Sequence, residues 1–405
     1  MHKIIVQKYG GTSVADTNKI KNVAKKIISY KKKGYSLVVV VSALGNTTDE
    51  LIELAHDITK SPSERELDML VSTGEQVSVA LLAMAIHKLG YEAISFTGAQ
   101  VGIITDKSHT QARILNINTK RIEQELKKGK VVIVAGFQGV TSHQDITTLG
   151  RGGSNLTAVA LAKALKAQVC EMFTDVDGVY TADPRIVPNA KKILNMSYEE
   201  MFELASLGAQ ILQARSVEMA QKFNVPIHVR SSFSNKQGTI ISKEERAMED
   251  IVVSGVTVNK DEAKITICDV SDRPGIAAKI FKYIADKGIN IDMIIQNISR
   301  TKATDISFTV LGKDLAKTMT VVKAISKKIG SKDVTYNKDI AKVSVVGIGM
   351  KSHSGIAARM FKALAKKKIN IEMISTSEIK ISCVIDKKSA DSAVRAIHDE
   401  FRLGK

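Results

Sequence analysis

The sequence predicts a mainly parallel α/β domain over residues 1–245, followed by two smaller α+β modules. Three observations carry this prediction. The chain has 405 residues, more than the roughly 250–300 at which one hydrophobic core usually stops growing, so it needs more than one domain. Short apolar runs alternate with amphipathic stretches as far as residue 241, and a 20-residue segment occurs twice in the C-terminal part.

The N-terminal apolar runs have the composition of buried parallel strands. They are rich in Val and Ile, apolar nearly throughout, and separated by stretches with helical periodicity, as in sheets covered by helices on both faces. This pattern predicts strands at residues 4–6, 37–42, 93–96, 131–135, 169–173 and 227–229. The charged stretch SKEERAMED at 242–250 follows the last run and indicates the domain boundary near residue 245.

The C-terminal part contains a duplication. GIAAKIFKYIADKGINIDMI at 275–294 and GIAARMFKALAKKKINIEMI at 355–374 are identical at 13 of 20 positions, at a fixed offset of 80 residues. Each copy has the pattern of a small α+β module of order βαββαβ. The candidate strands are 263–270, 289–298, 305–310 and 333–336 in the first copy, and 342–348, 369–376 and 380–385 in the second.

The second copy lacks one strand, whereas a spare strand at 251–258 precedes the first copy. We therefore expect the first module, residues 263–338, to be inserted within the second. The second module would then consist of residues 250–260 and 339–405.

Composition narrows the function classes. The net charge of +17 is unusual, but the lysines form short clusters at expected helix ends, and aromatic residues make up only 4% with no Trp. This pattern is typical of solvated helix faces and does not predict nucleic-acid binding. The longest apolar run, residues 37–41, is too short for a membrane span, and the N-terminus enters a strand pattern without a leader. Three widely spaced cysteines and no histidine cluster predict no resident metal site. We expect a cytoplasmic protein.

The first expected strand leads into a candidate phosphate-binding turn. No G-x-x-x-x-G-K-[ST] motif occurs, and GRGGSN at 150–155 departs from G-x-G-x-x-G at its last position. Lys8-Tyr9-Gly10-Gly11-Thr12-Ser13, however, lies between a strand and a helix. Paired glycines let backbone N–H groups approach phosphate oxygens, and Lys8 adds a charge. A plain strand-to-helix turn is the alternative.

Two further loops carry polar side chains of kinds that bind ligands. The first loop runs from Gly150 to Asn155, and the planar guanidinium of its Arg151 could donate two hydrogen bonds to a carboxylate. A glycine-rich helix cap with a surface arginine is the alternative. The second, FTDVDGVYTADPR at 173–185, follows a strand and combines three aspartates, a tyrosine and an arginine. It lacks the closing glutamate of an EF-hand and fits a nucleotide lid better.

These elements, in this order, closely resemble those of monofunctional bacterial aspartate kinases of the amino-acid kinase superfamily. The resemblance rests on KYGGTSV, VSTGEQVSVALLAMAI, FTGAQVGI, GFQGV, TLGRGGSNLTAVALAKAL and FTDVDGVYTADPR. It covers essentially the whole chain, because the duplicated modules resemble the paired ACT domains of that family. It implies a three-layer α/β sandwich with a mainly parallel sheet, and phosphorylation of L-aspartate by ATP with Mg²⁺.

The resemblance also implies site residues. Catalytic roles would fall to Lys8, Arg151 and Asn155. ATP would be held by Lys8, Gly10, Gly11, Ser42, Thr174, Asp175, Tyr180, Asp183, Arg185 and Gln210. Aspartate would be held by Thr48, Glu75, Arg151, Gly152, Gly153 and Ser154. An α-amino acid needs an anion for its ammonium and a guanidinium for its α-carboxylate, which Glu75 and Arg151 supply; a helix-start carboxylate is the ordinary alternative for Glu75.

Two positions depart from the family pattern. Relatives usually carry Asp where Asn155 stands, and many carry Lys where Gln210 stands. Asn155 keeps a hydrogen-bonding oxygen but loses a charge. A non-catalytic amino-acid sensor that uses only the ACT half is therefore the rival function.

The resemblance finally implies regulation by lysine, threonine or both, with effectors bound between the turn before a module's helix and the strand after it. The residues nominated for this are Asp272, Gly275, Ala277, Asn290, Asp292, Gln296, Ser352, Asn370, Thr376 and Glu378. Helix caps and core positions are the alternative for this set. Pairing of modules across a two-fold axis would make the sensor the interface of a homo-oligomer, namely a dimer; a tetramer, or an assembly with a separate C-terminal subunit, is the alternative.

Overall fold

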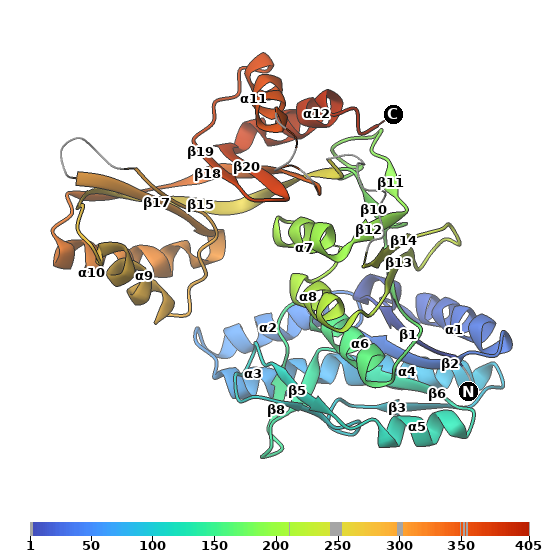
Figure 1. The fold of residues 1–405 in the computed structure, drawn as a ribbon. Coiled ribbons are helices and arrows are strands. Elements are labelled where there is room, and N and C mark those ends of the chain that lie inside the picture. Colours follow the sequence, from blue (N-terminus) through green and yellow to red (C-terminus); the bar gives the residue numbers. More distant parts are fainter. Residues whose placement is uncertain are drawn as a thin grey trace. The chain divides into compact units, whose positions relative to one another are not determined.

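The computed structural model describes residues 3–209, 211–243, 253–297, 303–348, 350, 353 and 355–404. The chain forms two compact units, each with its own core (Figure 1). The first unit comprises Met1–Tyr180, Lys192–Ser206 and Gln210–Met248. The second comprises Thr181–Lys191, Leu207–Ala209 and Glu249–Lys405. Gln210 and Ser352, both nominated from the sequence, lie outside the described residues.

The first unit is built on an eight-stranded sheet of order β12-β14-β13-β9-β1-β2-β6-β3. All neighbours pair in parallel except β13 and β14. The six strands predicted from the sequence are present. The bounds are β1 (Ile4–Tyr9), β2 (Ser36–Val41), β3 (Ala93–Phe96), β6 (Val131–Ala135), β9 (Val169–Thr174), β12 (Asn195–Ser197), β13 (Ile227–Ser231) and β14 (Thr239–Ser242).

Helices cover this sheet on two faces. On one face, α1 (Thr17–Lys32) and α4 (Thr73–Lys88) form a hydrophobic core with alternate residues of β1, β2 and β6. On the other, α6 (Gly153–Ala164) contacts β1, β2 and β9 and is followed outward by α8 (Ala214–Phe223). The first ten residues of α6 are all buried, which explains why it is apolar around its whole circumference. The mainly parallel α/β layering predicted from the sequence is confirmed.

One helical stretch, Glu64–Lys88, is long and apolar enough to cross a membrane by length and composition. It comprises α3 (Glu64–Val71) and α4. Four apolar side chains of α4, Val79, Leu82, Ala83 and Ile86, belong to the core against α1 and the sheet. Its hydropathy thus matches the packing of a core helix.

Shorter elements complete the first unit. They are α2 (Thr47–Ile58), α5 (Lys120–Lys127), α7 (Tyr198–Ser206), the 3₁₀ turn η1 (Gly11–Ser13) and the hairpin of β10 (Val179–Tyr180) with β11 (Lys192–Ile193). A small sheet of order β5-β4-β7-β8 consists of Ile114–Ile117, Ile103–Thr105, Gln138–Val140 and Ile146–Thr148. The sequence did not predict this sheet, because strands of three or four residues are too short to show a periodic pattern.

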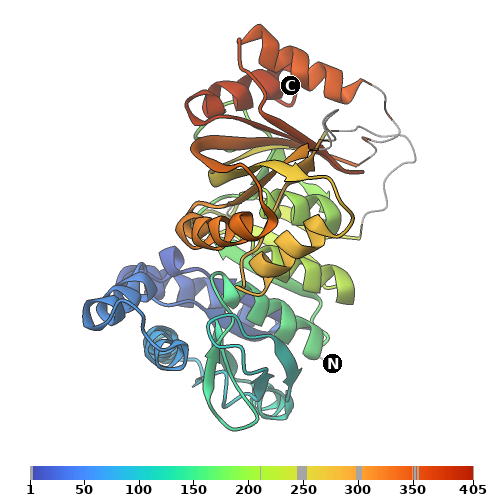
Figure 2. The same cartoon turned by 90° about the vertical axis from the view of Figure 1, so that its left-hand side faces the viewer.

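The second unit is one six-stranded antiparallel sheet of order β16-β17-β15-β18-β20-β19. Two helix pairs lie on opposite faces of this sheet, as Figures 1 and 2 show. The strands are β15 (Gly255–Ser271), β16 (Ile294–Gln296), β17 (Ala303–Leu311), β18 (Asp333–Val346), β19 (Met373–Thr376) and β20 (Lys380–Asp386). One helix pair is α9 (Ile276–Ala285) with α10 (Leu315–Ile329), and the other is α11 (Ile356–Lys366) with α12 (Ala390–Glu400). The 3₁₀ turn η2 (Gly312–Asp314) precedes α10, and the 3₁₀ turn η3 (Lys387–Ser389) precedes α12.

Two strand predictions for this unit were wrong. The expected strands 251–258 and 263–270 join into the single strand β15 across the polar residues 259–262, and 333–336 and 342–348 likewise join into β18. The join is possible because the β15–β18 register shifts between Asn259 and Glu262 and again before Lys264, which absorbs the interruption in the apolar pattern. Among the described residues of the predicted strand 289–298, Ile294–Gln296 form β16, and Asp292 and Met293 also hydrogen-bond to Thr309 of β17.

Candidate active site

The carboxyl ends of the parallel strands carry several of the residues nominated for the nucleotide in the first unit. The strand order reverses at β1, which lies between β2 and β9 although these are far apart in sequence. Ligands of open α/β sheets bind at such a switch point, outside the carboxyl ends of the strands. Gly10 follows β1, Ser42 follows β2, and Asp175 follows β9.

The turn after β1 brings backbones unusually close. The Gly10 N–H donates to the Phe173 carbonyl (3.3 Å), and the Gly45 N–H donates to the Gly11 carbonyl (3.1 Å). A Cβ at Gly11 would lie 2.9 Å from the carbonyl oxygens of Ala43 and Gly45, so no larger residue fits without a backbone shift. The glycine pair is thus required by local packing, and it leaves the turn without side chains that would obstruct a phosphate group.

Lys8 lies against this turn. A Cβ at Gly10 would lie 3.3 Å from Lys8 Nζ. Although its side chain is only partly buried, desolvation lowers the pKa of Lys8 to about 8, and the nearby Asp175 carboxylate opposes that shift. The turn therefore presents an ammonium that is poorly solvated and favours an additional anion.

The loop after β9 contacts the segment after β13. Thr174 donates to its neighbour Asp175 (2.9 Å), and the Asp177 carboxylate accepts from Ser234 Oγ (2.6 Å). Ser232 connects this region to the glycine turn, because its Oγ lies 2.6 Å from Ser13 Oγ. Ser232 and Ser234 were not predicted from the sequence, although their place directly after a parallel strand was a signal for them.

Tyr180 lies in the β10–β11 hairpin opposite Lys192. Asp183 and Arg185 belong to Thr181–Lys191, which packs within the second unit. They form a bidentate ion pair with 2.7 Å between Arg185 Nη2 and Asp183 Oδ2, and the Arg185 hydrogen bonds lower the pKa of Asp183. The nominated nucleotide residues of 173–185 are therefore divided between the two units.

Glu75 is a buried carboxylate in the first turn of α4, only 2% exposed. Its Oε1 accepts from the Ala43 N–H (3.1 Å), and its Oε2 has no hydrogen-bond partner among the described residues. Burial raises the pKa of Glu75 to about 7. A buried carboxylate with one unpaired oxygen is costly unless a cation binds it. Thr48, also nominated, lies in the first turn of α2.

Arg151 lies in a tight turn, residues 149–152, that we call the Arg151 turn. Gly150 and Gly152 have φ of 80° and 77°, a left-handed conformation that favours glycine. The Arg151 side chain is 92% exposed, and its Nη2 lies 3.1 Å from Asp49 Oδ1. Asp49 was not predicted, since nothing in the sequence relates positions about a hundred residues apart.

Gly153, Ser154 and Asn155 form the first turn of α6. Ser154 and Asn155 are 5% and 7% exposed. A Cβ at Gly136, directly after β6, would lie 2.7 Å from Ser154 Oγ, so this turn packs closely on a strand end. The N–H groups of Gly153 and Asn155 donate to the Gly150 and Gly152 carbonyls (2.9 and 3.0 Å), and the dipole of α6 gives its start a positive potential.

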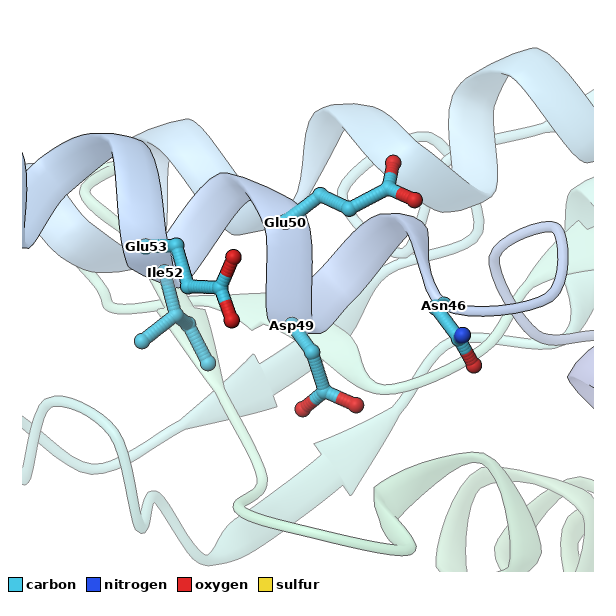
Figure 3. A pocket seen from close by; sticks show the side chains of 5 residues that line it. All are labelled: Asn46, Asp49, Glu50, Ile52 and Glu53. Atoms are coloured by element: carbon cyan, nitrogen blue, oxygen red, sulfur yellow. The ribbon is translucent and has the colours of Figure 1, made fainter.

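A hollow of about 550 Å³ lies beside α2 and is lined by Asn46, Asp49, Glu50, Ile52 and Glu53 (Figure 3). Asn46 and Asp49 extend from the same side of the helix. Three carboxylates in its lining would repel phosphate groups, so this hollow is not suited to a nucleotide. Through Asp49 it is instead connected to Arg151.

The residues nominated as effector contacts lie in the second unit. Gly275 has φ of 89° and precedes α9, with Asp272 exposed in the same turn and Ala277 in the helix. Asp292 pairs with Lys342. Asn290 and Asn370 are exposed at equivalent places of the two modules, as are Gln296 and Thr376, and Glu378 is also exposed.

Comparison with known proteins identifies the family. Residues 3–231 match the amino acid kinase family, and residues 269–325 and 343–401 match the ACT domain. The aspartate kinase of Pseudomonas putida is 53% identical over 401 residues, covering 99% of this chain and 98% of that protein. The aspartokinase of Corynebacterium glutamicum is 52% identical over 406 residues, covering 99% and 96%.

The chain belongs to the aspartate kinases of the amino acid kinase family. It is therefore an enzyme that phosphorylates aspartate. The aspartate kinase of Synechocystis, 47% identical, superimposes with a TM-score of 0.55 over 98% of this chain and 69% of that one. E. coli aspartokinase III in complex with aspartate and ADP, at 24% identity, shares the fold with a TM-score of 0.85 over 98% and 99%. The amino-acid-kinase and ACT architecture expected for this aspartate kinase is confirmed.

Proposed function

We propose that this aspartate kinase transfers the γ-phosphoryl group of ATP, supplied as its magnesium complex, to the β-carboxylate of L-aspartate. The product is 4-phospho-L-aspartate. The observation that carries the proposal is the unpaired, buried Oε2 of Glu75 in a unit that also holds the Lys8–Gly11 turn. One feature suits the ammonium of an amino acid, and the other suits phosphate.

ATP is assigned to the carboxyl ends of β1, β2 and β9. The N–H group of Gly11 and the ammonium of Lys8 would face its phosphates, and Gly10, without a side chain, would leave room for them, as at other glycine turns before helices. Ser42, Thr174, Asp175, Tyr180, Asp183, Arg185 and Gln210 complete the proposed nucleotide set. Mg²⁺ usually binds through the phosphates and few protein ligands, so we expect it to arrive with ATP.

Aspartate is assigned to Glu75 and Arg151, with Thr48, Gly152, Gly153 and Ser154 as neighbours. Ionised Glu75 would bind the α-ammonium. Arg151 would exchange its exposed contact with Asp49 for the α-carboxylate, to which a guanidinium can donate two parallel hydrogen bonds. This arrangement leaves the β-carboxylate free to react.

The chemistry needs no general base. The β-carboxyl group of aspartate has an ordinary pKa near 4, so it is ionised at neutral pH. One of its oxygens attacks the γ-phosphorus, a new P–O bond forms, and the bond to the β-phosphate oxygen breaks to release ADP. The residues therefore act by positioning and by charge neutralisation. Lys8 supplies positive charge to the phosphates, and Asn155 is proposed to orient it through its amide oxygen.

Regulation is assigned to the second unit. E. coli aspartokinase III has been crystallised with lysine and aspartate, and we propose lysine, threonine or both as feedback effectors here. Their binding residues would be those nominated at the module turns and strands. We also propose a cytoplasmic homo-oligomer that catalyses the first step of lysine, threonine and methionine biosynthesis.

We further propose that the first ACT module is inserted within the second. Residues 255–259 pair with residues 342–346 of β18, whereas residues 262–271 pair with β17 and the first half of β18. This pairing supports the assignment of the segment before the first module as the fourth strand of the second.

A coupled assay of ADP release tests the function. We expect turnover that requires both aspartate and ATP and falls when lysine or threonine is added. Glu75→Gln should raise the KM for aspartate and leave the KM for ATP unchanged. ATP hydrolysis independent of aspartate would contradict the proposed reaction, and no turnover at all would favour the sensor alternative.

A further inference from the structure

The start of α8 holds the Arg151 turn, residues 149–152, by its backbone. Arg215 donates from Nη1 to the Leu149 carbonyl (2.9 Å) and from Nη2 to the Ala112 carbonyl (3.0 Å). Gln213, which precedes the helix, donates from Nε2 to the Arg151 carbonyl (2.8 Å). These two side chains thus bind the two backbone carbonyls on either side of Gly150, and Arg215 also binds a third carbonyl, on a neighbouring segment.

Apolar packing supports the same contact. Ala112, Leu149 and Leu156 form a small buried cluster on which Met219 of α8 packs. Met219 lies one helical turn after Arg215 and faces the same side of the helix. Arg215 therefore reaches its two carbonyls from a helix already held against the residues that carry them.

The opposite side of the turn is held by Asp68 of α3, which is fully buried. Its carboxylate accepts from Thr148 Oγ1 (2.5 Å) and from the Thr110 N–H (3.0 Å). The Thr110 carbonyl in turn lies 3.2 Å from where a Cβ of Gly150 would be. The backbone of the turn is fixed from both sides, whereas the Arg151 side chain is almost fully exposed.

We propose that Arg215 is a positioning residue of this enzyme: it fixes the backbone from which Arg151 extends, so that Arg151 meets the α-carboxylate of aspartate in a defined place. Gln213 assists at the Arg151 carbonyl itself. This inference rests on the proposed role of Arg151. Arg215 has no contact with substrate in this assignment and acts only through the turn.

An arginine suits this task for a geometric reason. The planar guanidinium donates to two carbonyls at once, whereas a lysine would reach them only as a point charge. Arg215 is partly buried, so its removal leaves two carbonyls that water cannot fully solvate, and the turn would move to satisfy them. A displacement of about 1 Å in a substrate-holding group can cost on the order of a hundredfold in rate.

The test is steady-state kinetics of the full chain with aspartate and ATP varied separately. We expect Arg215→Gln to raise the KM for aspartate about 10- to 100-fold and to leave the KM for ATP within about twofold. Arg215→Lys should recover part of the loss. Lys222→Gln is the matched control, because it removes the same charge from the exposed part of the same helix, and it should change neither KM.

A double-mutant cycle separates positioning from general stability. Once Arg151 is replaced by Gln, the place of its backbone no longer matters, so adding Arg215→Gln should cost less than about twofold further in kcat/KM for aspartate. Additive losses, or equal increases in both KM values, would overturn the proposal. If Arg215→Gln does not fold, Gln213→Ala decides: a severalfold rise in the aspartate KM alone supports positioning, and no rise overturns it.

Failure of the proposed function would look different. A wild-type chain without aspartate-dependent turnover would contradict the assigned reaction. Calorimetric titration with aspartate would then still report on positioning, because the Arg215→Gln chain should bind aspartate about tenfold more weakly than wild type or Lys222→Gln. Equal affinities would overturn the proposal independently of catalysis.

Discussion

Lys342 Nζ lies 2.6 Å from Glu262 Oε1, and both side chains are only 2% exposed. Asp292, at 43% exposure, also contacts the Lys342 ammonium. Burial raises the pKa of Glu262 in spite of the ammonium beside it, so desolvation outweighs the attraction between the two charges. This buried pair is therefore a specific connection within the sheet and not a source of large net stability.

The connection has a counterpart related by the sequence duplication. Asp292 and Glu372 occupy equivalent positions, 80 residues apart. Asp292 contacts Lys342 at the start of the second copy, and Glu372 Oε2 lies 2.6 Å from Lys264 Nζ at the start of the first. Each copy thus offers one carboxylate to a lysine of the other. Asp292 was nominated as an effector contact, and in this structure its partner is a lysine of the chain itself.

Removing one member of the pair should be far worse than removing both. Lys342→Met leaves Glu262 buried without a cation, which typically costs about 3–5 kcal/mol. Glu262→Leu with Lys342→Met should recover most of this loss. Hydrogen exchange of the β15 and β18 amides in the full chain measures both effects, with Lys338→Met on the same strand as an exposed control. A single mutant as stable as wild type would contradict the buried-pair interpretation.

Ionisation of Glu75 should produce an acid limb in the pH profile of kcat/KM for aspartate, but not in that for ATP. Burial raises its pKa to about 7, and the proposed ammonium contact needs the ionised form. In the free enzyme kcat/KM for aspartate should therefore fall about tenfold per unit below pH 7, while kcat/KM for ATP stays level. Glu75→Gln should abolish this limb, and Glu50→Gln, an exposed change on α2, should keep it.

The same shift makes a prediction about stability. A carboxyl group whose folded pKa lies above its unfolded value of 4.5 stabilises the fold at low pH, and that contribution is lost as pH rises through about 7. Glu75→Gln should therefore raise the Tm at pH 8 while it weakens aspartate binding. A lower Tm at pH 8 would show that the buried charge has an ionic partner in the ligand-free chain.

Ionisation of Lys8 should produce an alkaline limb in the pH profile of kcat/KM for ATP. Burial lowers its pKa to about 8, and the phosphates need its protonated form, so kcat/KM for ATP should fall as pH rises above about 8. Lys8→Met should lower kcat by about 10²–10³, and Lys21→Met on the exposed face of α1 should be neutral. An alkaline limb that persists in Lys8→Met would belong to another group.

The parts of the fold that the sequence predicted are those with local causes. Residues 36–41, SLVVVV, are buried at every position, and such a run has few alternatives to a central strand. The turn with Gly10 and Gly11 was predicted for the same reason and lies directly after β1, whereas its role in binding phosphate stays a prediction. Local patterns failed at 259–262, where a register shift carries polar residues through a continuous strand.

The support of the site could not be predicted, because it depends on contacts between distant parts of the chain. Arg215 contacts Leu149 and Ala112, which are 66 and 103 positions away. Asp49 meets Arg151 across 102 positions. Likewise, the raised pKa of Glu75 is a consequence of burial by the whole domain. Motifs identify the groups that face a ligand, whereas tertiary packing determines what holds them in place.

We expect Asn155 to support catalysis although relatives usually carry Asp at this position. It is 7% exposed in the first turn of α6, where its amide oxygen can accept the hydrogen bond that a carboxylate would. We expect Asn155→Asp to change kcat by less than about tenfold, and Asn155→Leu, which removes the polar group, to lower it by about 10–100-fold. A gain above a hundredfold with Asp would indicate that the wild-type chain acts mainly as a sensor.

The second unit contains a buried histidine that connects to the nucleotide segment. His398 is fully buried; its Nε2 lies 3.0 Å from Thr181 Oγ1, and its Nδ1 has no partner among the described residues. Ala182 and Val187 belong to the same core as α11 and α12. The segment held in this way begins directly after Tyr180 and carries Asp183 and Arg185, both assigned to ATP.

Protonation of His398 should loosen this segment. Burial lowers the pKa of His398 below its usual 6.5, so the stability it contributes is complete above pH 6.5 and is lost as pH falls below that value. After correction for intrinsic rates, amides of α12 and 181–191 should exchange faster at pH 5.5 than at pH 7.5, and His398→Gln should remove the difference. Exposed His56→Gln should keep it.

Because the segment carries assigned nucleotide residues, Thr181→Val should raise the KM for ATP severalfold and leave the KM for aspartate unchanged. Equal changes in both KM values would mean that the Thr181–His398 contact serves stability alone.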